Sequence, residues 1–545
     1  MKNTYLFLAI TLFFANLSYS QQFCGFDAER SQLRQNPDYV ALEKAAEQRI
    51  QTAIQNRNST ANRTTDVLTI PVVIHVLHLG EAVGTGSNIS DAQIKSSINN
   101  LNDFYRGQTT NSPVDFQIEF ALAQRDPDCN ATTGINRIDA SSLTGYSDYG
   151  VNVNNSNGAS YSDIVGLSSW PQTDYFNVWI VTELDGNNGG YGFQGYAYFY
   201  NATGSHGSVM MSTVFGYDPG NTNGWGLNSN GDNSTVVHEL GHYFHLYHTF
   251  QGDGGGGTCP ADTTVGTNSD GCADTVPHKR ETSTCPDQNS CTRANWVDNN
   301  TINNIMSYYS CTDRMTNDQR TRVRAAMEGT SIVSSKGATA PDASYVAPVA
   351  VCNTNTVTTN NAGIYSVMLN GVTFSSGSSS TDGGNIDNSA NCSNYFEIDT
   401  SVSNTLEVGM FPVNLQQLGV WIDWNDDGDF DDDNEQQYLV TQNIAAGSTV
   451  PITLTYPSSI PYGDYVRIRL ITDIDERYTG ATAINSACFT SLYCGQSEDY
   501  TIYVKPATIT WTGAIDTDWA TTGNWNPTTV PTDAHDVVIP NGLAN

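Results

Sequence analysis

Residues 238–248 read HELGHYFHLYH and contain four of the nine histidines of the chain. His238 and His242 are one helical turn apart, so on a helix both imidazoles leave the same face and can bind one ion. Glu239 is offset by about 100° around that helix, where it can reach a metal-bound water without being a ligand. The H-E-x-x-H pattern is typical of zinc hydrolases and predicts that Glu239 is the catalytic base.

The third metal ligand follows from the path of the chain after this helix. If the helix continued, His245 would share the face of His238 but lie about 10 Å further along the axis, too far for one tetrahedral ion. If the chain turns sharply after His242, His248 can fold back toward the ion. Such a turn needs a left-handed residue, and histidine is among the non-glycine residues that tolerate this conformation. We therefore predict that Zn²⁺ binds His238, His242 and His248, and that His245 occupies the turn.

Apolar patterns on both sides of the motif predict further elements. Strands are expected at residues 67–77, 116–122, 175–182 and 208–211, and the last of them is expected to pair with extended substrate. Ser90-x-x-Gln93 and Thr316-x-x-Gln319 are capping boxes that open helices, and another helix begins near Asn233. This order of elements predicts an α/β or α+β domain.

The beginning of the chain and its composition indicate an exported protein. Residues 1–20 combine Lys2, an apolar run and a small-residue cleavage site, as in a secretory signal peptide, and no later run is long enough to span a membrane. The net charge of −33 speaks against nucleic-acid and membrane partners and favours cation binding, unless the acidity serves solubility alone. Eleven cysteines predict disulfides, and the odd number leaves at least one thiol without a partner in the chain.

The metal motif is part of a wider resemblance. With its third histidine it resembles the metzincin signature, His245 replacing Gly, and the LYHTF sequence that ends it looks like the pappalysin family. Asn304-Ile305-Met306-Ser307-Tyr308 is similar to that family's Met-turn, and residues 274–277 are similar to its Asp-Thr-Pro loop. The resemblance covers roughly residues 65–330. It implies an α+β metzincin-like fold, a twisted mixed sheet with active-site and backing helices, and peptide hydrolysis. It also implies that Met306 lies under the metal and that Tyr308 stabilises the oxyanion.

The same resemblance extends to several cysteines. Cys24-Gly25 is similar to the family's pro-segment motif, in which a thiolate occupies the open zinc position until the pro-segment is removed. This implies a latent zymogen, opened by a cut near Arg63; the alternative is a disulfide from Cys24 to Cys129 or Cys272. By order along the chain, the implied disulfides are Cys259–Cys291, Cys285–Cys311, Cys352–Cys392 and Cys488–Cys494.

A second cation site is predicted after a Ser/Ala/Pro linker, where short alternating runs indicate an all-β sandwich. Residues 423–431 read DWNDDGDFD and fit the start of a calcium loop of the D-x-N-x-D-G type. The candidate Ca²⁺ ligands are Asp423, Asn425, Asp427, Asp429, Asp431 and Glu435; the alternative is a solvated acidic turn. Through this loop and residues 495–500 the domain resembles GEVED domains.

Together these patterns divide the chain and predict its function. The expected units are a signal peptide (1–20), a pro-segment (21–64), a zinc metallopeptidase domain (65–330), a linker (331–347), a GEVED-like β-sandwich domain (348–505) and the incomplete start of a further β domain (506–545). The favoured function is a secreted zinc endopeptidase that acts on protein or peptide substrates, with surface attachment through a further C-terminal region as a variant. The alternatives are a surface adhesin with a degenerate peptidase domain, motivated by His245 and a shortened Met-turn, and a zinc hydrolase that is not a peptidase.

Overall fold

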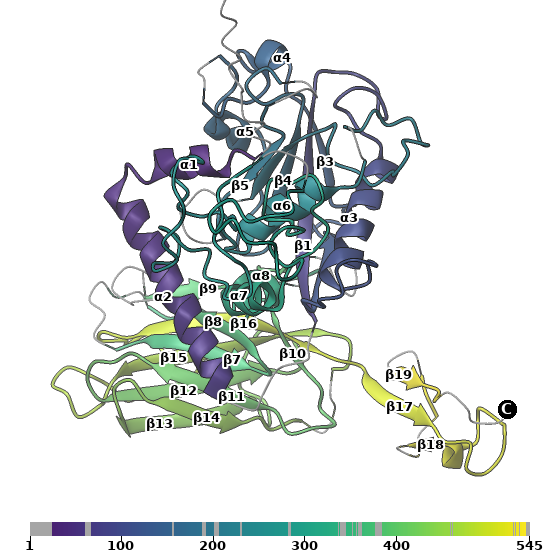
Figure 1. The fold of residues 1–545 in the computed structure, drawn as a ribbon. Coiled ribbons are helices and arrows are strands. Elements are labelled where there is room, and N and C mark those ends of the chain that lie inside the picture. Colours follow the sequence, from purple (N-terminus) through teal and green to yellow (C-terminus); the bar gives the residue numbers. More distant parts are fainter. Residues whose placement is uncertain are drawn as a thin grey trace, which may run out of the picture.

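The computed structural model shows a mixed α/β body, a β sandwich and a small terminal sheet (Figure 1). It describes residues 24–59, 67–154, 157–187, 192–200, 207–228, 231–281, 285–335, 337, 345–350, 352–355, 357, 362–375, 384–457, 459, 461–526, 528, 530–532 and 535–540. The predicted signal peptide and the cut near Arg63 therefore lie outside the described residues. Within these ranges no helix has the length and apolar character that a membrane crossing requires.

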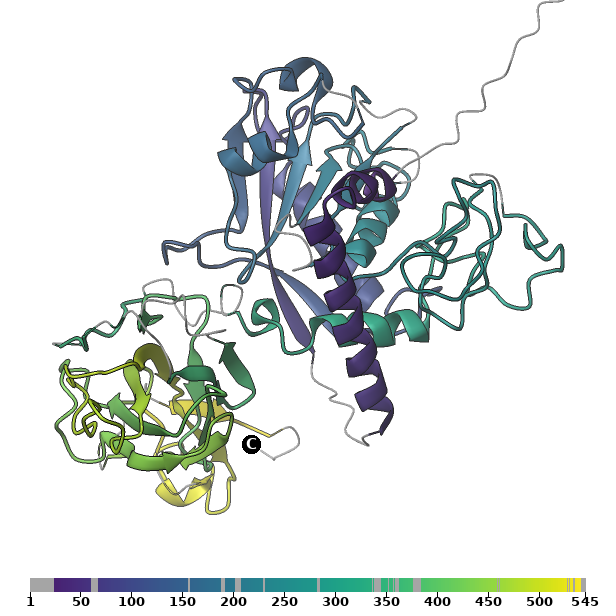
Figure 2. The same ribbon diagram turned by 90° about the vertical axis from the view of Figure 1, so that its left-hand side faces the viewer.

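Two helices open the described chain. They are α1 (Phe26–Leu33) and α2 (Pro37–Ser59). The side chain of Asn36 accepts a hydrogen bond from the backbone of Asp38 at 2.9 Å, and Pro37 takes the first helical position, where no backbone donor is needed. Figure 2 shows α2 lying along the α/β body, where it packs against α7 (Asn317–Met327).

The α/β body is built on a six-stranded mixed sheet. Its strands are β1 (Leu68–His78), β2 (Ile118–Leu122), β3 (Ile135–Asp139), β4 (Phe176–Val181), β5 (Gly195–Ala197) and β6 (Ser208–Met211). The order is β2-β1-β4-β6-β5, and β3 pairs with the second half of β1. All pairs are parallel except β5 with β6. The predicted strand at 208–211 thus lies inside the sheet, and β5 forms the edge.

Helices cover the sheet and carry the motif. They are α3 (Asp91–Tyr105), α4 (Tyr146–Tyr149), α5 (Tyr161–Leu167), α6 (Ser234–Tyr243), α7 and α8 (Ser331–Ser334). Thr316 and Gln319 form the predicted capping box at α7, whereas at α3 only Ser90 caps the helix. The Gln93 side chain instead donates to the backbone of Ser212 and Phe215, because it is buried against that loop.

The β sandwich follows as two packed sheets. Its strands are β7 (Ile364–Leu369), β8 (Val372–Ser375), β9 (Asn385–Asp387), β10 (Phe396–Ile398), β11 (Thr405–Met410), β12 (Gln416–Asp423), β13 (Gln436–Ile444), β14 (Thr449–Thr453), β15 (Tyr465–Ile474) and β16 (Gln496–Val504). One sheet has the order β10-β16-β15-β12-β13 and the other β14-β11-β7-β8. Alternate residues such as Val408, Leu418 and Ile468 fill the core between them. The predicted α+β fold followed by an all-β sandwich is confirmed.

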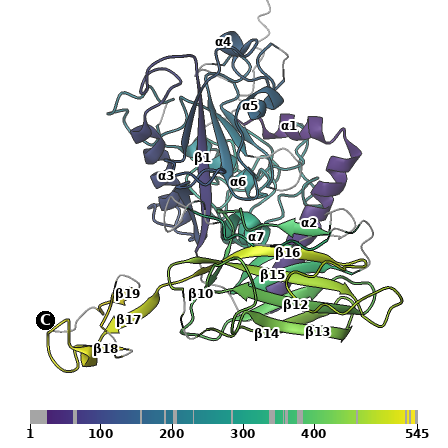
Figure 3. The ribbon, with the colours of Figure 1, turned by 180° about the vertical axis from the view of Figure 1, so that it is seen from behind.

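A smaller unit ends the described chain. It consists of β17 (Ala507–Trp511), the short 3-10 helix Thr522–Asn524, β18 (Trp525–Asn526) and β19 (His535–Val538). Seen from behind, it extends away from the sandwich on the side opposite α2 (Figure 3). The boundaries of the six expected units stay predictions.

Two of the four expected disulfides are present and two are not. Cys259–Cys291 and Cys285–Cys311 are present in the long loop between α6 and α7, as expected. The pairs Cys352–Cys392 and Cys488–Cys494 are wrong: the bonds are Cys352–Cys488 and Cys129–Cys392. Cys392 lies against the α/β body, where Arg125 donates to its carbonyl at 3.1 Å and the neighbouring Ser393 bonds the Tyr175 hydroxyl at 2.6 Å. Its nearest thiol is therefore in the other domain, which order along the chain could not reveal.

Candidate metal centre

Helix α6 places the first two candidate ligands and the candidate base. His238 and His242 are buried one turn apart, with Glu239 fully buried between them. Gly241 on this helix allows Met306 to approach, because an added Cβ would lie 2.4 Å from the Met306 sulfur. Met306 thus packs directly on the turn that carries both histidines, where the resemblance implied an apolar floor.

The chain bends immediately after α6. His245 has φ of +67°, the left-handed conformation expected for the turn. Its Nε2 lies 2.8 Å from the Tyr200 carbonyl, and its ring stacks on Phe199 with centroids 4.8 Å apart. The buried Arg322 donates to the His245 carbonyl at 2.8 Å. The turn is therefore held by its backbone and by its side chain, and it brings His248 back to α6.

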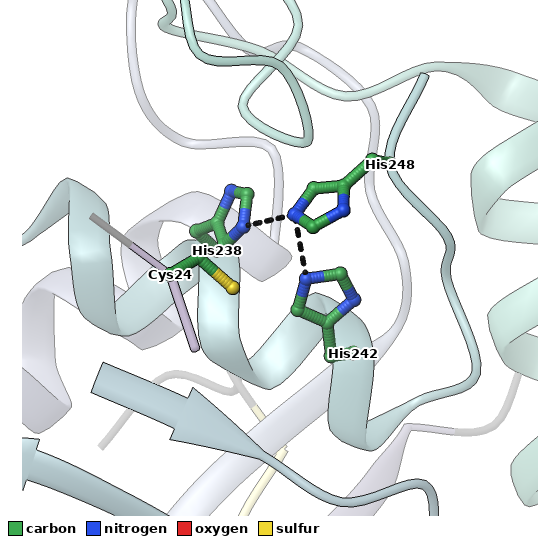
Figure 4. Close-up of side chains that lie close together, drawn as sticks. All are labelled: Cys24, His238, His242 and His248. Carbon is green, nitrogen blue, oxygen red and sulfur yellow. Dashed lines mark hydrogen bonds between the residues drawn. The ribbon is translucent and has the colours of Figure 1, made fainter. Parts of the chain in front are cut away.

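Three imidazole nitrogens converge at one point (Figure 4). Nε2 of His248 lies 3.2 Å from Nε2 of His238 and 3.1 Å from Nε2 of His242. Nitrogens bound to one tetrahedral zinc at 2.0–2.1 Å are separated by about 3.3 Å, so the spacing fits such an ion.

The protonation of two of these rings also suits a metal. Nδ1 of His238 lies 2.6 Å from the Ile305 carbonyl, and Nδ1 of His242 lies 2.8 Å from the Leu246 carbonyl. A carbonyl only accepts, so each Nδ1 carries the proton and each Nε2 keeps its lone pair. Burial lowers the pKa of His238 to about 3 and holds that of His242 well below its usual value, which favours the neutral, metal-binding form.

The sulfur of Cys24 joins the same group. Cys24 and the three histidines have ligand atoms that all lie within 4.8 Å of one another, and in Figure 4 the sulfur points toward the rings. The thiol is buried and free, so the alternative disulfide to Cys129 or Cys272 is not formed. Cys24 Sγ also lies 3.5 Å from Oε2 of Glu239.

Two further buried groups face the convergent rings. Oε1 of Glu239 and the hydroxyl of Tyr308 have no hydrogen-bond partner among the described residues. Burial raises the pKa of Glu239 to about 8 and holds that of Tyr308 well above its usual value. The Tyr308 ring lies 4.9 Å from the His248 ring. Buried polar groups without partners are uncommon and are expected where a bound ligand completes them.

The residues that follow Cys24 cover the site. Gly25 donates to the Gly195 carbonyl of β5 at 2.8 Å, and the Phe26 ring stacks on His242 at 3.9 Å. Asp27 Oδ1 lies 3.4 Å from Nδ1 of His248. The edge strand that receives an extended chain here is β5, so the expectation that residues 208–211 do so is wrong; β6 is paired on both sides.

Sequence reasoning did not find Gly195, Asp27 or Gly241. Gly195 lets the edge strand approach the base, because an added Cβ would lie 3.1 Å from Cγ of Glu239. A three-residue strand after a glycine-rich stretch has no alternation to reveal it. The one sequence feature that could have pointed to Asp27 is its position three residues after Cys24.

The acidic loop of the sandwich is arranged differently. Carboxylates of Asp427, Asp429 and Asp432 lie within 4.8 Å of one another, so Asp432 replaces the expected Asp431 in this group. The backbone of Asp431 instead donates to Asp429 at 3.0 Å.

The remaining candidates brace the loop. Asp423 accepts from the backbone of Gly428 at 3.0 Å, and Glu435 accepts from the backbone of Trp424 at 3.0 Å and of Asp432 at 3.1 Å. The Asn425 amide donates to Asp427 at 3.0 Å.

Comparison with known proteins agrees with this geometry. Residues 159–328 match the model of the family described as pregnancy-associated plasma protein-A, and residues 417–503 match the GEVED domain. Residues 159–328 form a pappalysin-family metalloendopeptidase domain.

Relatives of this chain include extracellular metalloproteases and several solved structures. An extracellular metalloprotease of Arthroderma otae is 26% identical over 266 residues, 48% of this chain and 78% of that protein. One of Podospora anserina is 28% identical over 315 residues, 55% of this chain and 87% of that protein. Among solved structures, a promirolysin mutant of Tannerella forsythia is 27% identical and covers 57% of this chain and 96% of its own, with a TM-score of 0.40. Mature mirolysin in complex with a cleaved peptide is 28% identical and covers 48% and 91%, with a TM-score of 0.35.

Proposed function

We propose that the protein is a secreted zinc endopeptidase, made as a latent zymogen, that hydrolyses peptide bonds in extracellular proteins. The observation that carries the proposal is the position of His248 Nε2, 3.2 Å from Nε2 of His238 and 3.1 Å from Nε2 of His242, with the buried Glu239 on the same helix as the first two ligands. Extracellular relatives and a promirolysin likeness agree with export and latency.

The three histidines would hold Zn²⁺. When bound, the ion lowers the pKa of a water molecule toward neutrality and polarises the scissile carbonyl. The backbone acceptors at Ile305 and Leu246 orient two of the rings, so the chain keeps its ligand atoms aimed at one point before any ion binds.

Glu239 is the general base in this proposal. Its carboxylate accepts the proton of the attacking water and then delivers it to the leaving amine. The enclosed position of Glu239 raises its pKa, which favours retention of the proton between the two transfers.

Tyr308 and β5 position the substrate. The buried Tyr308 hydroxyl is free to donate to the oxyanion that forms from the carbonyl. The Gly195 carbonyl, which accepts from Gly25 in the latent chain, would accept from an extended substrate backbone after the pro-segment leaves.

Cys24 keeps the enzyme latent in this proposal. Its sulfur lies in the same group as the three imidazoles and would take the fourth position at the metal. Removal of the pro-segment would free this position for water.

Replacement of Glu239 by Ala tests the mechanism. We expect the purified variant to keep one zinc per chain while casein cleavage falls by about 10²–10⁴-fold, since it loses a general base and no ligand. Unchanged cleavage with retained zinc would refute the role of Glu239. Wild-type chain that binds no zinc and cleaves no peptide library, with or without chelator, would favour the degenerate-peptidase adhesin instead.

We also propose that the acidic loop of the sandwich binds Ca²⁺ through Asp427, Asp429 and Asp432. Their carboxylates gather on a loop braced by the buried Asp423 and Glu435, and hard oxygen ligands suit Ca²⁺. Asp431 is not in this group of carboxylates, and the Asn425 amide lies beside the group, where it donates to Asp427.

A further inference from the structure

Arg280 is fixed beside the metal centre. Its Nε lies 2.9 Å and its Nη2 lies 2.8 Å from the two oxygens of Asp253, which is fully buried, and its backbone NH donates to the same carboxylate at 2.8 Å. The guanidinium carbon lies 4.8 Å from the centroid of the Phe250 ring, which itself stacks on His248 at 4.6 Å. The cation therefore has one orientation, next to a candidate zinc ligand.

The pro-segment supplies a carboxylate to this cation. Asp27 Oδ2 lies 3.1 Å from Nη2 of Arg280, while its other oxygen lies 3.4 Å from Nδ1 of His248. Asp27 is only three residues from Cys24 and belongs to the segment that the proposed activation removes.

His248 differs from the other two histidines in what its Nδ1 faces. Nδ1 of His238 and of His242 donates to a carbonyl of the peptidase domain, and these acceptors stay after activation. Nδ1 of His248 is buried and has no hydrogen-bond partner among the described residues; the carboxylate of Asp27 lies 3.4 Å from it. Loss of the pro-segment thus leaves a buried N–H and one edge of a guanidinium without the carboxylate that now faces both.

We propose that Arg280 and the Nδ1–H of His248 form a carboxylate-binding subsite, which Asp27 occupies in the latent chain and an acidic group of the substrate occupies in the mature enzyme. Arginine presents several N–H donors in a plane and prefers carboxylates, and Asp253 uses only part of this set. The carboxylate would lie one imidazole ring away from the reacting carbonyl, so the preference applies to a position close to the cleaved bond. This inference rests on the proposed peptidase function.

The first test measures substrate preference of the mature enzyme. Quenched peptides with one cleavage site carry Asp, Glu, Asn or Gln at each position around the bond, each with a free or an amidated C-terminus. We expect kcat/KM for Asp or Glu to exceed that for Asn or Gln by about tenfold at one position. A preference that follows the free terminus would identify a chain-end carboxylate as the ligand.

Two variants make the test specific. Arg280→Gln is expected to reduce the acidic-to-amide ratio of kcat/KM to below about threefold. Lys279→Gln removes the same charge from the neighbouring residue, whose ammonium donates to Gly257 at 3.2 Å, and should keep the wild-type ratio. No acidic preference in the wild type, or the same preference in Arg280→Gln, would overturn the subsite while general cleavage still supports the peptidase.

A second measurement uses only the wild-type mature enzyme, in case Arg280→Gln does not fold. A synthetic peptide of residues 22–36 is expected to inhibit, and the same peptide with Asp27→Asn should have an inhibition constant about tenfold higher. Equal inhibition by the two peptides would also overturn the subsite.

Discussion

Two regions of this molecule were expected to hold cations, and they are built in opposite ways. The candidate zinc ligands come from a helix and a returning turn, are buried, and have ring protons fixed by backbone carbonyls. The acidic loop is local in sequence, and two of its three gathered carboxylates are exposed. In the buried site the ligand atoms are in place before an ion binds, and folding bears the free-energy cost of this arrangement. In the exposed acidic loop the carboxylates repel one another, and a bound ion or protons reduce that repulsion.

Of the tests that compare these two regions, the largest effect should come from Cys24, whose thiol would close the buried site. We expect the unprocessed Cys24→Ala chain to cleave peptides at least about tenfold faster than the unprocessed wild type, because water would gain the fourth metal position. The assay uses the secreted chain before any cut, checked by mass. Cys272→Ala, which removes the other free buried cysteine of this domain, should remain latent. A latent Cys24→Ala chain would show that the thiol is not what blocks the site.

A smaller effect, on stability, is expected at the turn that brings His248 back to α6. His245→Gly and His245→Ala both lose the stack on Phe199 and the contact with Tyr200, so their difference reports the left-handed backbone alone. We expect the Gly variant to be more stable than the Ala variant by about 1 kcal/mol in denaturant unfolding. The Glu239→Ala background prevents self-cleavage during the measurement. Equal stability of the two variants would mean that the turn does not hold φ near +67°.

The smallest effect is expected from the acidic loop, through which pH and calcium should change the Tm by a few degrees at most. Burial raises the pKa of Asp423 to about 6 and of Glu435 to about 7, from ordinary values of 3.8 and 4.5. The stability that protonation contributes is therefore present below the ordinary values and is lost as the pH rises through 6 to 7. Calcium on Asp427, Asp429 and Asp432 would offset the negative charge that these protons neutralise at low pH, since Asp427 repels the charged form of Asp423 and Asp432 that of Glu435. The calcium-induced increase of Tm should therefore be larger at pH 7.5 than at pH 5. Asp432→Asn should reduce the increase more than Asp431→Asn, and equal effects would contradict the grouping seen here.

The parts of the molecule that depend on neighbouring residues were predictable from sequence. The helix with His238 and His242, the left-handed His245 and the Thr316 cap all follow from backbone geometry within a few residues. The α+β and sandwich folds follow from apolar periodicity that runs over whole elements.

The parts that depend on contacts between distant segments were not predictable from sequence. Cys392 bonds Cys129 across 263 residues because two domains touch there, and no spacing rule expresses that contact. The edge strand β5 is too short to show a pattern, and a role for Asp27 can be inferred only from its contact with Arg280. In the acidic loop, the shift from Asp431 to Asp432 depends on a local bend that composition does not specify.

The bond between Cys129 and Cys392 has a topological consequence for an enzyme that can meet copies of itself. Everything from residue 130 to residue 391, including α6 and the long loop between α6 and α7, lies inside the covalent ring that this bond closes. One cut anywhere in that ring opens it without releasing a fragment, so a nicked enzyme stays in one piece until it meets a reductant.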